Sequence, residues 1–295
     1  MRQYIARRLI QFVPTLVGVS LVVFLLLRVI PGDVATLVMM GTGAGAQPRL
    51  EEVEKLREQL GLNRPLHVQY LDWAWGMVRL DPGKSMWTDE PVIDEIKRRF
   101  PLTLELAILT SIVSLLIAMP IGVLSAMRQD TWVDYLFRTV SIAGLAMPTF
   151  WTGTLIILAL VILFNWMPPL GAAGLFEDPQ TNLQQLVWPS VALGYYLSAI
   201  VSRMVRSQML EVLREDYIRT ARAKGLRERL VVYRHALKNA ILPVVTIVGI
   251  QLTILLGGAV IIETVFVLPG MGANLVDAIF HRDYTMVQAV LLLFA

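Results

Sequence analysis

Long runs of uncharged, mostly apolar residues constrain this chain more than any other feature of its sequence. Five such runs cover residues 12–27, 106–127, 139–164, 186–202 and 240–262. A helix needs about 20 apolar residues to cross a hydrocarbon core of about 30 Å, and the fourth run reaches that length only with its flanks. The runs predict a bundle of membrane-spanning helices.

The composition supports that prediction. Of the 295 residues, 56% are hydrophobic and 17% are charged, whereas a soluble domain carries about 25% charged residues. We therefore expect an all-α polytopic membrane protein. The chain has no cysteine, which excludes a disulfide scaffold and cysteine-ligated zinc or iron–sulfur sites. His67, His235 and His281 are dispersed along the sequence and predict no metal cluster.

Hydrophobic runs also lie close to both ends of the sequence. Residues 12–27 follow three arginines, an arrangement that a cleaved signal peptide shares. The run is too long for a signal peptide, however, and no small-x-small cleavage site precedes Pro31. We predict a first membrane-spanning helix instead. Residues 285–295 are too short to cross a membrane and predict a sixth helix that is cut short.

The segment from residue 33 to residue 99 reads as a soluble insert. Apolar residues between Leu50 and Leu60 follow helical spacing, and Gly61 stands where a helix stops. Three tryptophans follow, namely Trp73, Trp75 and Trp87. Tryptophan is common at headgroup level, which predicts that the insert lies along the membrane surface. The same tryptophans could instead form a small core of the insert, and both interpretations stay open.

Basic residues set the expected orientation. Arginines flank the connection 128–138, and Lys and Arg are densest between residues 203 and 238, whereas 165–185 has neither. Because cytoplasmic connections are enriched in Lys and Arg, we place the N-terminus and the two basic connections in the cytoplasm. The insert, the 165–185 connection and residues 263–283 then lie outside.

These assignments divide the chain into three parts. Residues 1–32 hold the N-terminus and the first helix, and residues 33–99 form the extracytoplasmic insert. Residues 100–295 form the core, with the second to sixth helices and the basic connection 211–239.

The basic connection is patterned as two helices. Leu213, Tyr217 and Ala221 fall on one helical face, and Gly225 follows at a C-cap position. A second stripe comprises Leu226, Leu230, Tyr233 and Leu237. We therefore predict two short amphipathic helices joined at a glycine.

Three uses of this connection are open from its residues alone. It could lie on anionic lipid headgroups, as basic amphipathic helices do. It could be a solvated loop without a partner, or it could dock into a soluble cytoplasmic partner. The compact helix–glycine–helix form favours docking, because a rigid element transmits a displacement and a flexible loop does not.

Several motifs in the sequence resemble one known family. Residues 216–226 and 234–240 resemble the cytoplasmic coupling loop of bacterial binding-protein-dependent ABC permeases. They are most similar to the first permease subunit of the dipeptide, oligopeptide and nickel branch. Further motifs of that branch follow in the same order, at residues 4–9, 30–33, 60–62, 147–153 and 268–272. Arg219 and Thr220 stand where the wider family has Glu-Ala, in a form that is typical of the peptide branch.

The resemblance implies one subunit of a larger importer. It implies a type I ABC importer permease fold, with six transmembrane helices and an insert after the first helix. The implied partners are a second homologous permease, two cytoplasmic ATPases and an extracytoplasmic substrate-binding protein, around a lipid bilayer and without nucleic acid. ATP and Mg²⁺ would bind the ATPases, so this chain would have no cofactor and no catalytic residue. The implied location is the bacterial inner membrane, with the N-terminus in the cytoplasm.

The resemblance also implies which residues couple this chain to an ATPase. The set comprises Tyr217, Arg219, Thr220, Ala221, Arg222, Ala223, Lys224, Gly225, Leu226 and His235. Gly225 would allow a tight turn, and Ala221 and Ala223 would allow a close approach. Arg222 and Lys224 would supply polar anchoring.

A second set of residues is expected along the substrate path. It comprises Glu105, Pro148, Phe150, Trp151, Gln251 and Glu263. The two glutamates stand at the outer ends of runs, where a carboxylate could meet a peptide amino terminus or a metal. They could also lie at headgroup level or pair with a partner subunit.

The expected function is import of di- or oligopeptides by alternating access, with nickel or glutathione as alternative substrates. An ion-coupled carrier or an intramembrane enzyme is a more remote alternative. The chain is not expected to be the ATPase. Gly83, Lys84 and Ser85 resemble the end of a phosphate-binding loop, but that loop needs a glycine where this chain has Val78.

Overall fold

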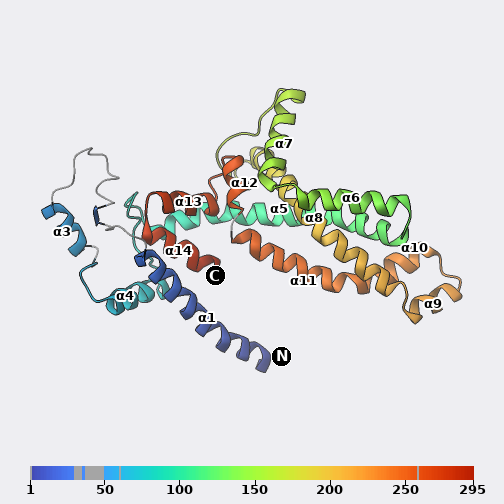
Figure 1. The fold of residues 1–295 in the computed structure, drawn as a ribbon, viewed down its shortest axis with the longest axis horizontal. Helices are drawn as coiled ribbons and strands as arrows, with labels where there is room; N and C mark the ends of the chain where they lie inside the picture. Colours follow the sequence, from blue (N-terminus) through green and yellow to red (C-terminus); the bar gives the residue numbers. More distant parts are fainter. Residues whose placement is uncertain (1, 30–34, 37–49, 60, 258) are drawn as a thin grey trace. The chain divides into compact units, whose positions relative to one another are not determined.

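The computed structural model describes residues 2–29, 35–36, 50–59, 61–257 and 259–295. Within these ranges the chain is helical, and its β structure is one isolated antiparallel bridge between Lys84 and Pro91 (Figure 1). The helices group into two compact units, which are described separately. The first unit is Met1–Pro101 with Met271–Ala295, and the second is Leu102–Gly270.

The first unit combines the N-terminal third of the chain with its last two helices. It contains α1 (Arg2–Val29), α3 (Leu50–Gln59), α4 (Leu66–Val78), the start of α5 (Val92–Met127), α13 (Met271–Phe280) and α14 (Tyr284–Phe294). Its main apolar cluster joins α5 to α13 and α14 through Val92, Met271, Tyr284 and Val287. The insert therefore packs with the C-terminal helices of the same unit.

The predicted helix stop at Gly61 is confirmed. Gly61 has a φ of +66°, and its N–H donates to the carbonyl of Glu58 at 3.0 Å. The N–H of Leu62 donates to the carbonyl of Arg57 at 3.0 Å. This pair of bonds is a Schellman motif, in which glycine supplies the left-handed residue that ends the helix.

The three tryptophans of the insert have different surroundings. Trp73 packs against Phe24 of α1 and Tyr70 of α4, with ring centroids 5.9 and 6.1 Å away. Trp75 and Trp87 are exposed, and the ring of Trp87 lies 4.1 Å from that of His281. Trp73 thus belongs to a small aromatic core, as the interpretation of a core within the insert predicted. Trp75 and Trp87 are exposed, so contact of these two with the membrane surface stays a prediction.

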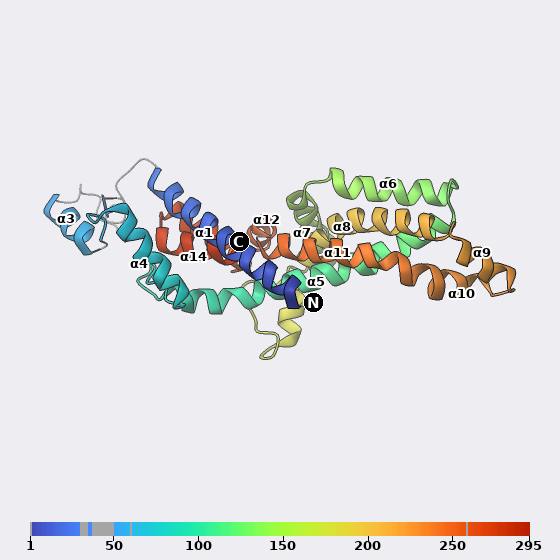
Figure 2. The same cartoon turned by 90° about the horizontal axis from the view of Figure 1, so that it is seen from below.

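The second unit holds the remaining helices. It contains the rest of α5, α6 (Trp132–Ala146), α7 (Thr149–Phe164), α8 (Pro179–Val212), α9 (Asp216–Ala223), α10 (Glu228–Leu230), a π-helix η1 (Val231–Ala236), α11 (Leu237–Leu256) and α12 (Val260–Val265). Helices α6 and α11 both pack on α8, and they run alongside it in Figure 2. Helix α8 is therefore the central element of this unit.

Two glycines bring α5 and α8 into close contact. A Cβ added at Gly122 of α5 would lie 2.6 Å from the Cβ of Val205 and 2.8 Å from the carbonyl oxygen of Ser202, both on α8. A Cβ added at Gly194 of α8 would lie 2.9 Å from the Cβ of Val113 on α5. Small residues let the backbones of membrane helices approach closely, and here each helix supplies one.

The expected spans are found only in part. By length and composition, α5 and the continuous helix Glu228–Leu256 can each cross a membrane. The predicted span over residues 139–164 is divided between α6 and α7, which meet at an angle of 102° and so form either a broken span or a re-entrant loop. Proline explains the break, since Pro148 cannot donate the backbone hydrogen bond that would continue α6. Shorter apolar helices cover Ile10–Leu25, Met271–Phe280 and Tyr284–Phe294.

Candidate functional site

Helix α9 buries one side and exposes the other. Ile218 and Ala221 are 0% and 7% exposed, and they belong to one apolar cluster with Met209 of α8 and Val231 and Val232 of η1. Burial of an apolar side chain of this size stabilises the fold by about 1.5–3 kcal/mol, so α9 is fixed to the unit by its own sequence. The other side of the helix faces outward.

A Schellman motif ends α9 at the predicted glycine. Gly225 has a φ of +75°, and its N–H donates to the carbonyl of Arg222 at 2.9 Å. The N–H of Leu226 donates to the carbonyl of Ala221 at 3.4 Å. Leu226 packs against the same cluster as Ile218, which is the apolar contact that accompanies this motif. The turn predicted at Gly225 is therefore confirmed in detail.

An ion pair crosses that turn. The guanidinium of Arg222 donates two hydrogen bonds to the carboxylate of Glu228, from Nε at 3.2 Å and from the terminal nitrogen at 2.8 Å. These bonds raise the pKa of Arg222 above its ordinary value. Both side chains are about half exposed, so the pair stabilises the fold by at most about 1 kcal/mol. Its two-point geometry nevertheless fixes the relative orientation of the two segments.

The prediction of a second short helix after Gly225 is wrong. Residues 228–256 form one continuous helix, in which α10 leads through the π-helix Val231–Ala236 into α11. No glycine interrupts the sequence between residues 228 and 248, so the chain has no cap at which a short helix would end. Helix α9 is thus joined at Gly225 directly to the base of the long helix.

The residues expected to couple to an ATPase divide between the two sides of α9. Arg219, Thr220, Ala223 and Lys224 are exposed, together with Gly225 itself. Ala221 is buried in this chain's own cluster, so the close approach predicted for it serves internal packing. The remaining members, Leu226 and His235, are half-buried, and Tyr217 is 42% exposed.

A buried ion pair lies near the same end of the unit. The guanidinium of Arg206 on α8 donates to both carboxylate oxygens of Asp134 on α6, at 2.8 and 2.6 Å. Ser125 of α5 also donates to Asp134, and so does the N–H of Asp130 at 3.1 Å. Asp134 is fully buried. This cluster connects three helices, and sequence reasoning missed it because its members lie up to 81 residues apart.

Comparison with known proteins identifies the family. Residues 118–295 match the family described as binding-protein-dependent transport system inner membrane component, and residues 1–107 match the N-terminal family of such components. The chain belongs to this family of inner membrane transport components. It is the membrane permease subunit of an ABC importer, a class of subunit that normally has no catalytic site of its own.

Curated relatives of this permease subunit match along its whole length. The glutathione transport system permease protein GsiC of Escherichia coli (strain K12) is 39% identical over 295 residues, which is 100% of this chain and 92% of the relative. The GsiC protein of Salmonella typhimurium (strain LT2) matches with the same identity and coverage. A crystal structure of an amino acid ABC transporter shares the fold, with a TM-score of 0.52 and 15% identity over 68% of this chain and 86% of that one.

The two glutamates predicted on the substrate path of the permease have partners within the chain. Glu263 of α12 is fully buried, and the hydroxyl of Thr103 on α5 donates to it at 2.9 Å. Glu105 is half-buried and accepts a hydrogen bond from the amide of Asn182 on α8 at 2.8 Å. In this structure Glu263 is therefore buried within the second unit, and its role in transport stays a prediction.

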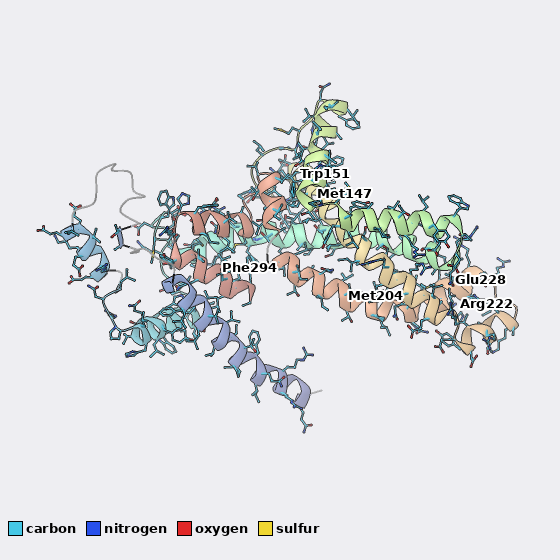
Figure 3. All side chains as sticks on the ribbon, viewed as in Figure 1. Met147, Trp151, Met204, Arg222, Glu228 and Phe294 are labelled. Carbon is cyan, nitrogen blue, oxygen red and sulfur yellow. The ribbon has the colours of Figure 1, made fainter. Side chains whose placement is uncertain are left out.

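The other path residues of the permease lie on two helices. Pro148 is the N-cap of α7, and Phe150 and Trp151 lie in its first turn with side chains 49% and 46% exposed. Gln251 is half-buried on α11. Figure 3 shows Trp151 beside Met147 at the bend between α6 and α7, away from Arg222 and Glu228 at the other end of the unit. Their role in transport stays a prediction.

A substitution at Gly270 tests the packing around Glu263. A Cβ at Gly270 would lie 2.3 Å from the carboxyl carbon of Glu263, which has no room to withdraw because it is fully buried. We expect Gly270→Ala to lower the free energy of unfolding of the permease by about 1–2 kcal/mol, measured by thermal unfolding in detergent. Glu263→Asp shortens the side chain by one methylene and should recover part of the loss. Equal stability of Gly270→Ala and wild type would contradict this packing.

Proposed function

We propose that this permease subunit imports short peptides, with glutathione as the first substrate to test. The observation that carries the proposal is the 39% identity to glutathione permeases over the entire chain. Glutathione is itself a tripeptide, so it belongs to the class of substrate that the peptide-branch motifs favour. A glutathione or dipeptide substrate would be delivered by an extracytoplasmic binding protein, as the family description implies.

The driving force would come from separate ATPases that contact α9. The exposed side of α9 and its turn presents cationic side chains at Arg219 and Lys224, beside the small residues Ala223 and Gly225. Such a surface fits a shallow groove with acidic groups in a partner protein. ATP and Mg²⁺ would bind those ATPases, and their closure would bias the permease between inward-open and outward-open states. The proposal places residues 211–239 in the cytoplasm and pairs this chain with a second permease.

Uptake into proteoliposomes tests the function. The complex of both permeases and the ATPases is reconstituted with the binding protein outside and ATP inside. We expect ATP-dependent uptake of labelled glutathione, and competition by short peptides. Uptake of dipeptides but not of glutathione would change the substrate and keep the proposed class of short peptides. Uptake of nickel alone would overturn the proposal.

The Gly225→Val variant of the same complex tests the docking role. A β-branched residue in a left-handed conformation costs about 1–2 kcal/mol, so the turn should lose its shape in most molecules. Because a Cβ at Gly225 meets nothing within 4 Å, the change acts through the backbone and not through a clash. We expect uptake per ATP hydrolysed to fall about tenfold while the protein remains in the membrane. Normal uptake would contradict the role of this turn.

A further inference from the structure

Both side-chain hydrogen-bonded links that leave α9, within the described residues, end on the long helix Glu228–Leu256. One is the ion pair between Arg222 and Glu228, whose carboxylate stands at the first residue of that helix. In the other link, the amide of Asn239 on α11 donates to the hydroxyl of Tyr217 at 2.7 Å. The two links attach the two ends of α9 to points eleven residues apart on the same helix.

We propose that Arg222, Glu228, Tyr217 and Asn239 are positioning residues that make α9 and the long helix one lever. The inference deepens the proposed function and rests on it, because it assigns the route by which movement of an ATPase reaches the membrane. It also changes the role expected for Arg222. Its guanidinium is occupied by Glu228 of its own chain, so it shapes the turn and does not anchor the ATPase.

The electrostatics of the turn support this assignment. Glu228 lies at the N-terminus of a helix and Arg222 lies in the last turn of α9, the positions that favour an anion and a cation respectively. The pair is therefore favoured by both helix ends as well as by its own charges. Exposed ion pairs add little to global stability, so the fold does not depend on this one. What the pair contributes is a fixed angle between α9 and the helix that follows.

The packing beneath the turn points the same way. Ile218 and Leu226 lie in one apolar cluster with Val231 and Val232, which belong to the π-helix at the base of the lever. A groove of about 360 Å³ borders the ion pair and is lined by Leu210, Leu213 and Arg214 as well as by Arg222 and Glu228. Met209 of α8 belongs to the same cluster, so α9 packs on both helices, but among the described residues its outgoing side-chain hydrogen bonds run to the long helix.

A charge exchange distinguishes a positioning residue from an ATPase anchor. The variants are Arg222→Glu, Glu228→Arg and the double exchange, each in the complete complex with both permeases and the ATPases. We expect each single change to lower substrate transported per ATP hydrolysed about tenfold, within the range shown by coupled neighbours. The double exchange should recover most of that ratio, although the charge at residue 222 is then reversed. ATPase affinity should stay within about twofold throughout.

The conservative variant and a second pair sharpen the test. Arg222→Lys keeps the charge but loses the two-point geometry. We therefore expect its ratio of substrate transported to ATP hydrolysed to lie between those of wild type and Arg222→Glu. Tyr217→Phe removes only the hydroxyl and should lower the ratio in the same direction. As a control, Arg219 is 80% exposed, and its ion pair with Asp216 at 3.4 Å is a single contact between two exposed side chains that leaves the guanidinium accessible. Arg219→Glu should therefore weaken ATPase affinity itself.

The outcomes separate this inference from the proposed function. A double exchange as impaired as the single changes would overturn the lever, as would a loss of ATPase affinity in Arg222→Glu that Arg222→Lys restores. In both cases an effect of Arg219→Glu on affinity would leave the docking role intact. If the wild-type chain bound no ATPase at all, the proposed function would fail first.

Discussion

Replacing Arg206 by alanine is expected to destabilise the second unit by about 3–5 kcal/mol. The change leaves Asp134 buried between α6, α8 and α5 without its guanidinium partner, although two donors remain near it. An uncompensated charge in a buried position is among the most costly defects that a fold can hold. The measurement is thermal or denaturant unfolding of the full-length chain in detergent, together with the fraction that elutes as a single species.

Matched variants separate charge burial from other effects of the change. Arg203 lies one turn earlier on α8 and is exposed, so Arg203→Ala should stay within about 0.5 kcal/mol of wild type. Replacing both partners, Asp134→Leu with Arg206→Leu, should cost clearly less than Arg206→Ala, because no charge is then left unpaired and only the Ser125 hydroxyl and the N–H of Asp130 lose an acceptor. A double variant as unstable as Arg206→Ala would show that the loss has another cause.

Placing leucine at Gly122 is expected to cost about 3 kcal/mol, the upper part of the range for an overfilled interior. Its Cβ would stand 2.6 Å from the Cβ of Val205 and 2.8 Å from the backbone oxygen of Ser202, and a backbone cannot move aside cheaply. Helices α5 and α8 would have to separate along their contact. The same unfolding measurement reports the loss, and a cysteine cross-link between the two helices would report the separation.

Gly249 supplies the control for this substitution. It lies on α11 with no atom within 4 Å of an added Cβ, so Gly249→Leu should retain the stability of wild type. Gly194 offers a second test from the opposite helix, because its Cβ would lie 2.7 Å from a methyl carbon of Val113. If Gly122→Leu and Gly249→Leu unfolded at the same temperature, the close contact between α5 and α8 would be refuted.

The coupling turn is the part of the site that sequence reasoning reaches best. A glycine after a helical stripe of Leu213, Tyr217 and Ala221 predicts a left-handed end of the helix, and Gly225 has that conformation. The signal is local, so neighbouring residues suffice to read it. The buried face is nevertheless centred on Ile218 and Ala221, because the cluster beneath α9 is supplied by α5 and α8 before it and by the long helix after it.

Features that depend on distant residues are not predictable in the same way. The ion pair of Asp134 with Arg206 joins helices that no local pattern pairs. No residue pattern in this sequence predicts the π-helix at Val231–Ala236. The continuity of the helix from residue 228 to residue 256 is therefore not predicted either. The sequence did offer a signal for the bend at Pro148, since a proline interrupts an otherwise uniform apolar run. The proline does not set the size of the bend, which is 102°.

That bend has a consequence for how the protein is made. Helices α6 and α7 have 15 and 16 residues, and so are about 23 and 24 Å long, each shorter than the hydrocarbon layer. Lipid cannot satisfy the polar backbone that a corner exposes, so the corner needs cover from neighbouring helices. The corner at Met147 and Pro148 should therefore form only after later helices have arrived to shelter it. Biogenesis of this subunit would then have an order, in which its third hydrophobic segment folds late.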